Sequence, residues 1–109
     1  GVFQTADGNL DATVQRSTWA DVATSRIEKY PPSGTLWVTT KIPIDELSLR
    51  LWTKKRIPVK NLTERNQKQI KKGDGIIVPL QRRMLFQQSQ QKATFYDDSG
   101  KMYVYLRWE

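Results

Sequence analysis

The sequence predicts an α+β protein, built as a small antiparallel sheet or partly open barrel of about four to six strands with two helices. Three patterns support this class. Apolar residues recur at helical spacing after Thr18, β-branched residues alternate from residue 35, and a turn signal at 97–100 separates two strand-like runs. The 109 residues fit one domain, 1–109, near the commonest domain size.

The first helix is expected at residues 18–30. Thr18 and Asp21 have the spacing of a capping box, in which each side chain bonds the backbone N–H of the other residue. Apolar residues then follow at helical spacing, namely Trp19, Val22, Ala23, Ile27 and Tyr30. The proline pair at 31–32 should end the helix, because proline cannot continue it. Before the helix, residues 1–10 are small and polar and predict a loose N-terminal arm.

Residues 35–44 should form a strand, because β-branched and apolar residues alternate there and Pro43 suits a strand end or an edge. Residues 45–52 are ambiguous. The leucines at 47, 49 and 51 alternate as in a strand, whereas Asp45 and Glu46 suit the first turn of a short helix. A strand is favoured.

A second helix is expected at residues 61–72, after an extended segment at 57–59. Asn61 or Thr63 would cap its N-terminus, and Gly73 would provide the left-handed stop. The segment has only two apolar residues, so the helix should lie on the surface with a narrow buried stripe.

The last third of the chain predicts two further features. A strand should run over residues 76–86, with Pro79 marking an edge or a bulge. A C-terminal β-hairpin should pair residues 93–96 with 101–108 across the turn at 97–100. On its second strand one face is expected to be core, formed by Met102, Val104, Leu106 and Trp108.

Charge is concentrated in the middle of the chain. Ten of the eighteen Lys and Arg residues lie between residues 54 and 83 with only two acids, which gives this segment a net charge of +8. Clustered Lys and Arg neutralise phosphates and release counterions, so we expect a non-enzymatic module that binds RNA or DNA mainly through phosphate contacts. A plainly solvated surface is the alternative interpretation. The candidate nucleic-acid contacts are Lys54, Lys55, Arg56, Lys60, Arg65, Lys68, Lys72, Arg82 and Arg83.

An aromatic row on the last strand is a second candidate. Tyr103, Tyr105 and Arg107 share the face opposite the expected core residues, and exposed rings and guanidinium planes of this kind stack on unpaired bases. The opposing interpretation is that a helix covers this face and buries the rings.

Composition argues against catalysis. The chain has no Cys and no His, which removes thiolate chemistry, disulfides and the commonest metal ligands. The adjacent acids at 45–46 and 97–98 suit caps and turns better than a catalytic pair, because neighbours on a strand point to opposite faces. We therefore expect no enzyme activity, no catalytic residues, no metal and no cofactor.

Other partners remain open. The chain suits a structural or assembly subunit of a virus, phage or secretion machine, which would dock on an acidic protein surface or form a homo-oligomer through strand edges. An anionic membrane surface is a weaker third option, since the basic segment lacks a broad apolar face. No apolar run is long enough to span a membrane and no signal pattern is present, so we expect a soluble chain of undetermined compartment.

Overall fold

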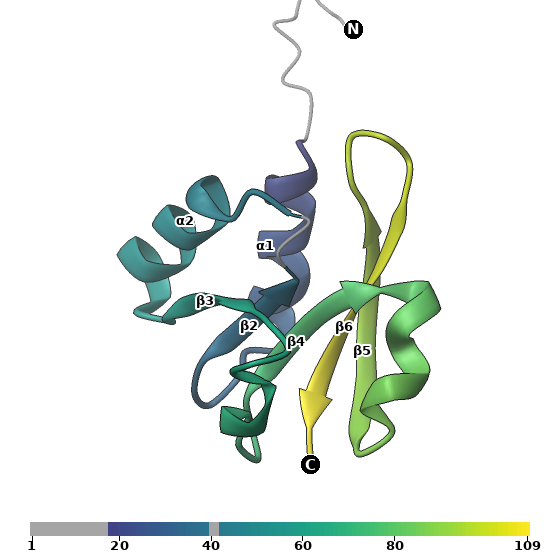
Figure 1. Cartoon of the computed structure of the whole chain (residues 1–109). Coiled ribbons are helices and arrows are strands. Elements are labelled where there is room, and N and C mark those ends of the chain that lie inside the picture. The colour runs from purple at the N-terminus through teal and green to yellow at the C-terminus, as the bar shows by residue number, and fades with distance from the viewer. Residues whose placement is uncertain (1–17, 40–41) are drawn as a thin grey trace, which may run out of the picture.

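A computed structural model of the chain describes residues 18–39 and 42–109, without the side chains of Thr53 and Lys54. The predicted arm at 1–10 lies outside the described residues. The α+β class is confirmed (Figure 1). In chain order the elements are α1 (Trp19–Lys29), β2 (Leu36–Thr39), α2 (Asp45–Lys55), β3 (Val59–Leu62), the 3₁₀ helix η1 (Gln67–Gln69), β4 (Gly75–Pro79), the 3₁₀ helix η2 (Leu80–Phe86), β5 (Ser89–Tyr96) and β6 (Met102–Trp108).

The strands form one open, mixed sheet in the order β3-β2-β4-β6-β5. β2 runs parallel to both β3 and β4, whereas β6 is antiparallel to β4 and β5. The expectation of an antiparallel sheet is therefore wrong for this half of the fold. Parallel neighbours need a crossover between them, and α2 supplies it between β2 and β3.

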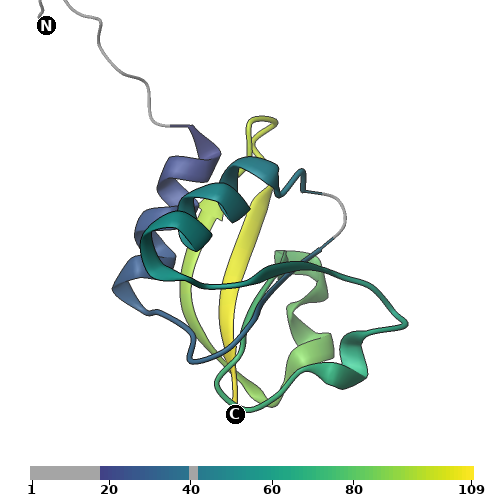
Figure 2. The same cartoon turned by 90° about the vertical axis from the view of Figure 1, so that its left-hand side faces the viewer.

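Both faces of the sheet are covered. α1 and α2 lie on one side and the two 3₁₀ helices on the other, as the turned view shows (Figure 2). The helical side buries a cluster that includes Ile27, Leu51 and Tyr105. The opposite side buries a second cluster of Trp37, Leu62, Ile76, Val78, Phe86, Val104 and Leu106. We call the side of this second cluster the 3₁₀ face.

The first helix and the C-terminal hairpin confirm their predictions. Thr18 is the N-cap of α1, and both hydrogen bonds of the capping box with Asp21 are present. β5 and β6 pair across the turn at 97–100, where Gly100 has a positive φ of 86°. The first strand of the hairpin begins earlier than the predicted residue 93, because the antiparallel pairing of β5 already starts at Ser89.

The predicted strand at 45–52 is wrong, because α2 is a helix. Leu47 and Leu51, four residues apart, are buried on one side of it, while Leu49 between them is 68% exposed. The alternation of leucines therefore does not describe a sheet face. Arg56 ends the helix in the left-handed conformation with φ of 58°.

The predicted helix at 61–72 is also wrong. Residues 59–62 form the edge strand β3, and only the short η1 at 67–69 is helical. Gly73 does have positive φ, at 92°, but it belongs to the turn before β4.

The predicted strand at 76–86 ends at Pro79, after which the chain forms η2. Of the strand expected at 35–44, residues 36–39 are confirmed, residues 40–41 lie outside the described part, and residues 42–44 are wrong because they form the irregular chain that leads into α2. None of the helices in the described ranges is long and apolar enough to cross a membrane.

Candidate functional site

The cations of the basic segment are mostly solvent-exposed. They lie at the end of α2, on β3 and on the chain between β3 and β4, and two of them, Arg82 and Arg83, lie on η2. Within the described ranges, the ion pairs join Arg50 to Asp21 and Glu46, and none involves a cation between residues 55 and 83. The exposed cations of the predicted set are Lys55, Arg56, Lys60, Arg65, Lys68, Lys72 and Arg82, and the side chain of Lys54 is outside the description.

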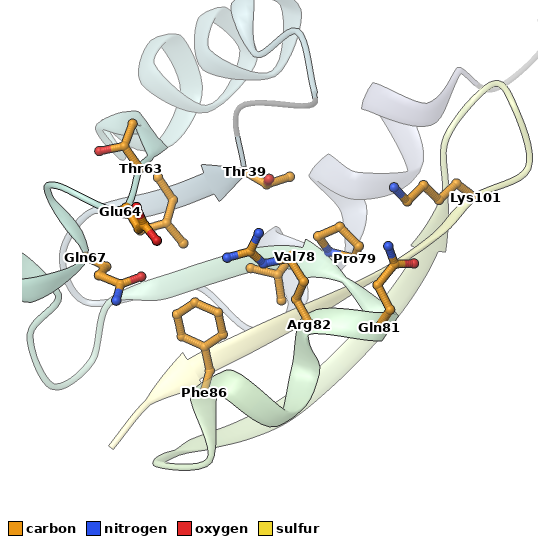
Figure 3. A pocket seen from close by; sticks show the side chains of 11 residues that line it. Thr39, Thr63, Glu64, Gln67, Val78, Pro79, Gln81, Arg82, Phe86 and Lys101 are labelled. Atoms are coloured by element: carbon orange, nitrogen blue, oxygen red, sulfur yellow. The ribbon is translucent and has the colours of Figure 1, made fainter.

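Two hollows open on the 3₁₀ face and collect some of these cations. The first, which we call the η2 hollow, has a volume of about 390 Å³ and lies between η2 and the chain that follows β3 (Figure 3). Arg82 and Lys101 line it. The second, which we call the Trp37 hollow, has a volume of about 460 Å³ and is lined by Lys60 and Lys71. Core residues of the same cluster line both hollows, so both belong to one side of the molecule.

A buried carboxylate organises the Trp37 hollow. Asp74, 6% exposed, accepts hydrogen bonds from the backbone N–H of Thr35 at 3.1 Å and of Lys71 at 2.9 Å, and from Trp37 Nε1 at 2.9 Å. The nearby ammonium of Lys60 lies 5.8 Å from the centre of the Trp37 ring. Asp74, one of the two acids in the basic segment, therefore bonds the backbone and the Trp37 indole. It forms no ion pair with the surface cations described here.

Arg83 is not a free surface cation. Its guanidinium donates to the carbonyl of Phe86 at 3.0 Å and to the carbonyl of Ser89 at 3.2 Å, with a third bond to Ser89 Oγ at 3.3 Å. The two bonds to Ser89 connect η2 to the first residue of β5. Its neighbour Arg82 is exposed and lines the η2 hollow instead.

The stacking prediction is wrong for the tyrosines of β6. Tyr103 is 2% exposed and Tyr105 is fully buried beneath α1 and α2, so neither ring can meet a base. Burial raises the pKa of Tyr105 to about 12, and its hydroxyl donates to the carbonyl of Tyr30. Arg107 donates to the carbonyl of Pro31 at 2.7 Å. The alternative interpretation, in which a helix covers this face, agrees with the burial.

Polar side chains that the sequence analysis missed complete the η2 hollow. Thr63, Glu64 and Gln67 reach it from the chain after β3, and Gln81 reaches it from η2 (Figure 3). Leu62, Val78 and Phe86 form its apolar floor. The hollow lies where β2, β3 and β4 reach their carboxyl ends, at Thr39, Leu62 and Pro79. A prediction of three parallel strands that end at the same edge would have indicated this hollow. The sequence instead predicted a helix at residues 61–72.

Comparison with protein-family models, curated proteins and solved structures gives no match. The function therefore has to be inferred from the residues and geometry of this chain. Among the residues that the structure describes, no group of three or more acidic side chains could hold a metal ion, and the sequence contains no His or Cys.

Proposed function

We propose that this chain is a non-enzymatic module that binds nucleic acid through phosphate contacts on the 3₁₀ face. The observation that carries the proposal is the set of exposed cations around two hollows of one sheet face, without ion-pair partners among the described residues. Such cations attract a polyanion and release its counterions on contact. The core contact set is Lys60, Lys71 and Arg82, with Lys68 on η1.

Two changes refine the predicted contact set. Lys71, which lines the Trp37 hollow beside Lys60, joins it. Arg83 leaves it, because its guanidinium is bonded within the fold. Lys55 and Arg56 remain candidates at the end of α2, where Arg56 lies 5.6 Å from the Trp52 ring centre.

Salt-dependent binding tests the proposal. Fluorescence anisotropy would measure the affinity for a labelled single-stranded oligonucleotide without guanine over a series of salt concentrations. For single strands the slope of log K against log salt is about −0.7 per phosphate contact. The variant Lys60→Gln/Lys71→Gln should bind more weakly. Its slope should be less negative by about 1.4 if both side chains contact phosphate.

The matched control is Lys29→Gln/Lys92→Gln. It removes the same charge, and its two lysines lie 5.6 and 5.8 Å from the centre of an aromatic ring, Tyr30, as Lys60 lies beside Trp37. Tyr30 packs on the helical side of the sheet, so the control should keep nearly the full slope. A salt-independent affinity, or an equal change in both variants, would contradict the proposal.

Self-assembly is a second candidate, favoured by one observation. η2 exposes Leu80, Met84 and Leu85, at 49%, 70% and 67%, and leads into β5, which ends the described sheet with one unpaired side. Sedimentation without nucleic acid should then show a discrete oligomer that Met84→Gln/Leu85→Gln dissociates. A monomer at every concentration would exclude this candidate.

A further inference from the structure

The η2 hollow has an apolar floor and a polar rim, as sites for flat organic groups do. Phe86, only 5% exposed, lies at the floor with Val78. The volume of the η2 hollow, about 390 Å³, falls in the range of small-molecule pockets, roughly 300–1,000 Å³. A single heterocyclic base can enter a hollow of this size.

The rim has hydrogen-bonding capacity that the fold does not use. The side chains of Glu64, Gln67, Gln81 and Arg82 form no hydrogen bond or ion pair with any described residue, although all four line the same hollow. Glu64 is the single acid among the lining residues. Two carboxylate oxygens thus face the hollow from one wall, and a guanidinium reaches it from η2 (Figure 3).

This arrangement orients a nucleotide. The negative phosphate is attracted to Arg82 and repelled by Glu64, so the phosphate belongs on the η2 side and an N–H edge belongs at the carboxylate. Guanine carries two adjacent N–H donors, at N1 and N2, which match the two oxygens of a carboxylate. Adenine and cytosine place an acceptor beside their amino group, and uracil places a carbonyl on each side of its one N–H. A bidentate bond to Glu64 therefore selects guanine.

We propose that the η2 hollow binds one unpaired guanine of a single-stranded nucleic acid, with Glu64 reading its N1–H and N2–H. The amide of Gln67, on the same side of the hollow as Glu64, is available to the guanine O6, and Phe86 provides the apolar floor (Figure 3). A base paired in a duplex hides this edge, so the ligand is a single strand or a loop. The inference rests on the proposed function, because phosphate contacts outside the hollow hold the rest of the strand.

The experiment uses three labelled oligouridines of equal length: one unmodified, one with a central guanosine and one with a central inosine. Inosine lacks only the N2 amino group. The guanosine strand should bind the full chain about 5- to 150-fold tighter than oligouridine, as for a bidentate base contact, and the inosine strand should fall between them.

The variant Glu64→Ala should bind the unmodified, guanosine and inosine strands with nearly equal affinity. Glu64 is exposed and unbonded among the described residues, so its removal leaves the fold intact. Loss of a negative charge near the phosphates should also raise the affinity for plain oligouridine. The control Glu28→Ala makes the same change on α1 and should keep the guanosine preference.

The outcomes separate the two proposals. Equal, salt-dependent binding of all three strands would overturn the guanine site and leave phosphate binding standing. A guanosine preference that survives Glu64→Ala would also overturn the guanine assignment. Absence of binding to every strand at low salt would overturn both proposals.

Discussion

Replacement of Asp74 by Asn should destabilise the fold, because this carboxylate joins three segments. Its Oδ1 accepts from the Thr35 N–H, and its Oδ2 accepts from Trp37 Nε1 and the Lys71 N–H. An amide has one acceptor oxygen. In either orientation of Asn, at least one of these donors would face an NH₂ group that cannot accept a hydrogen bond.

The expected loss of unfolding free energy follows from the burial of the donors that Asp74 bonds. An unpaired buried donor costs about 1–3 kcal/mol, and the remaining bonds lose the strength that a charged acceptor gives them. Asp74 is 6% exposed and Trp37 3%, so water has little access to a donor that loses its partner here. We expect Asp74→Asn to lower the free energy of unfolding by about 2–4 kcal/mol in total.

Urea denaturation at neutral pH measures this loss. With a slope of about 2 kcal/mol/M, the midpoint should fall by about 1–2 M. Asp98→Asn, at an exposed position in the hairpin turn, is the control and should change stability by less than about 0.5 kcal/mol.

A double-mutant cycle with Trp37→Phe isolates the indole bond. The two residues should couple by about 1–2 kcal/mol, because Asp74→Asn removes the charged acceptor of this hydrogen bond and Trp37→Phe removes its donor. Strict additivity, or a loss below about 0.5 kcal/mol for Asp74→Asn alone, would refute the reasoning.

Two further predictions concern titrating groups. Tyr105→Phe should cost about 1–2 kcal/mol at pH 7, since the partly buried carbonyl of Tyr30 loses its donor. Because burial raises the pKa of Tyr105 from 10.0 to about 12, wild-type stability should fall as pH rises from 10 to 12, and the difference from Tyr105→Phe should shrink there. At the hairpin turn, the hydroxyl of Ser99 is the main cause that holds the pKa of Asp97 below 3.8. Ser99→Ala should raise that pKa toward 3.8, which a carboxyl NMR titration would measure. The ionised Asp97 stabilises the fold above pH 3.8, and in the variant this stabilisation should be lost at a higher pH as acid is added. An unchanged titration would contradict the assignment to Ser99.

Local signals in the sequence predicted those elements whose stabilising contacts are local. The capping box of Thr18 and Asp21 specifies the start of α1 through hydrogen bonds three residues apart. The turn before β6 likewise carries its own hydrogen bonds, from the N–H groups of Ser99 and Lys101 to the Asp97 carboxylate. No distant part of the chain is needed to read either feature.

Elements that depend on distant contacts were missed. Leu47 and Leu51 are buried because α2 packs against α1 and β3, and nothing in the spacing of three alternating leucines identifies this partner. β3 exists because its four residues pair with β2, twenty-three positions earlier. Without that pairing, Asn61 and Thr63 read as helix caps, so the polar residues of the η2 hollow were assigned to a helix surface.

The candidate site was predictable only in its charge. Composition identified the basic segment and its excess of cations, which the described ion pairs leave unneutralised. Which cations are free depends on hydrogen bonds that no local pattern reveals, as with Arg83. Burial of Tyr103 depends in turn on the packing of α1 over β5.

The contrast between Arg82 and Arg83 governs how any survey of the basic segment by mutagenesis should be interpreted. Substitution of Arg83 removes its hydrogen bonds from η2 to Ser89 and Gln91 of β5, so reduced oligonucleotide affinity in that variant would report a displaced η2 rather than a missing phosphate contact. Arg82 has no such attachment among the described residues, and its substitution acts on the ligand alone. Two arginines adjacent in the chain would thus give similar binding curves for unrelated reasons, and only a thermal melt recorded beside each curve would distinguish them.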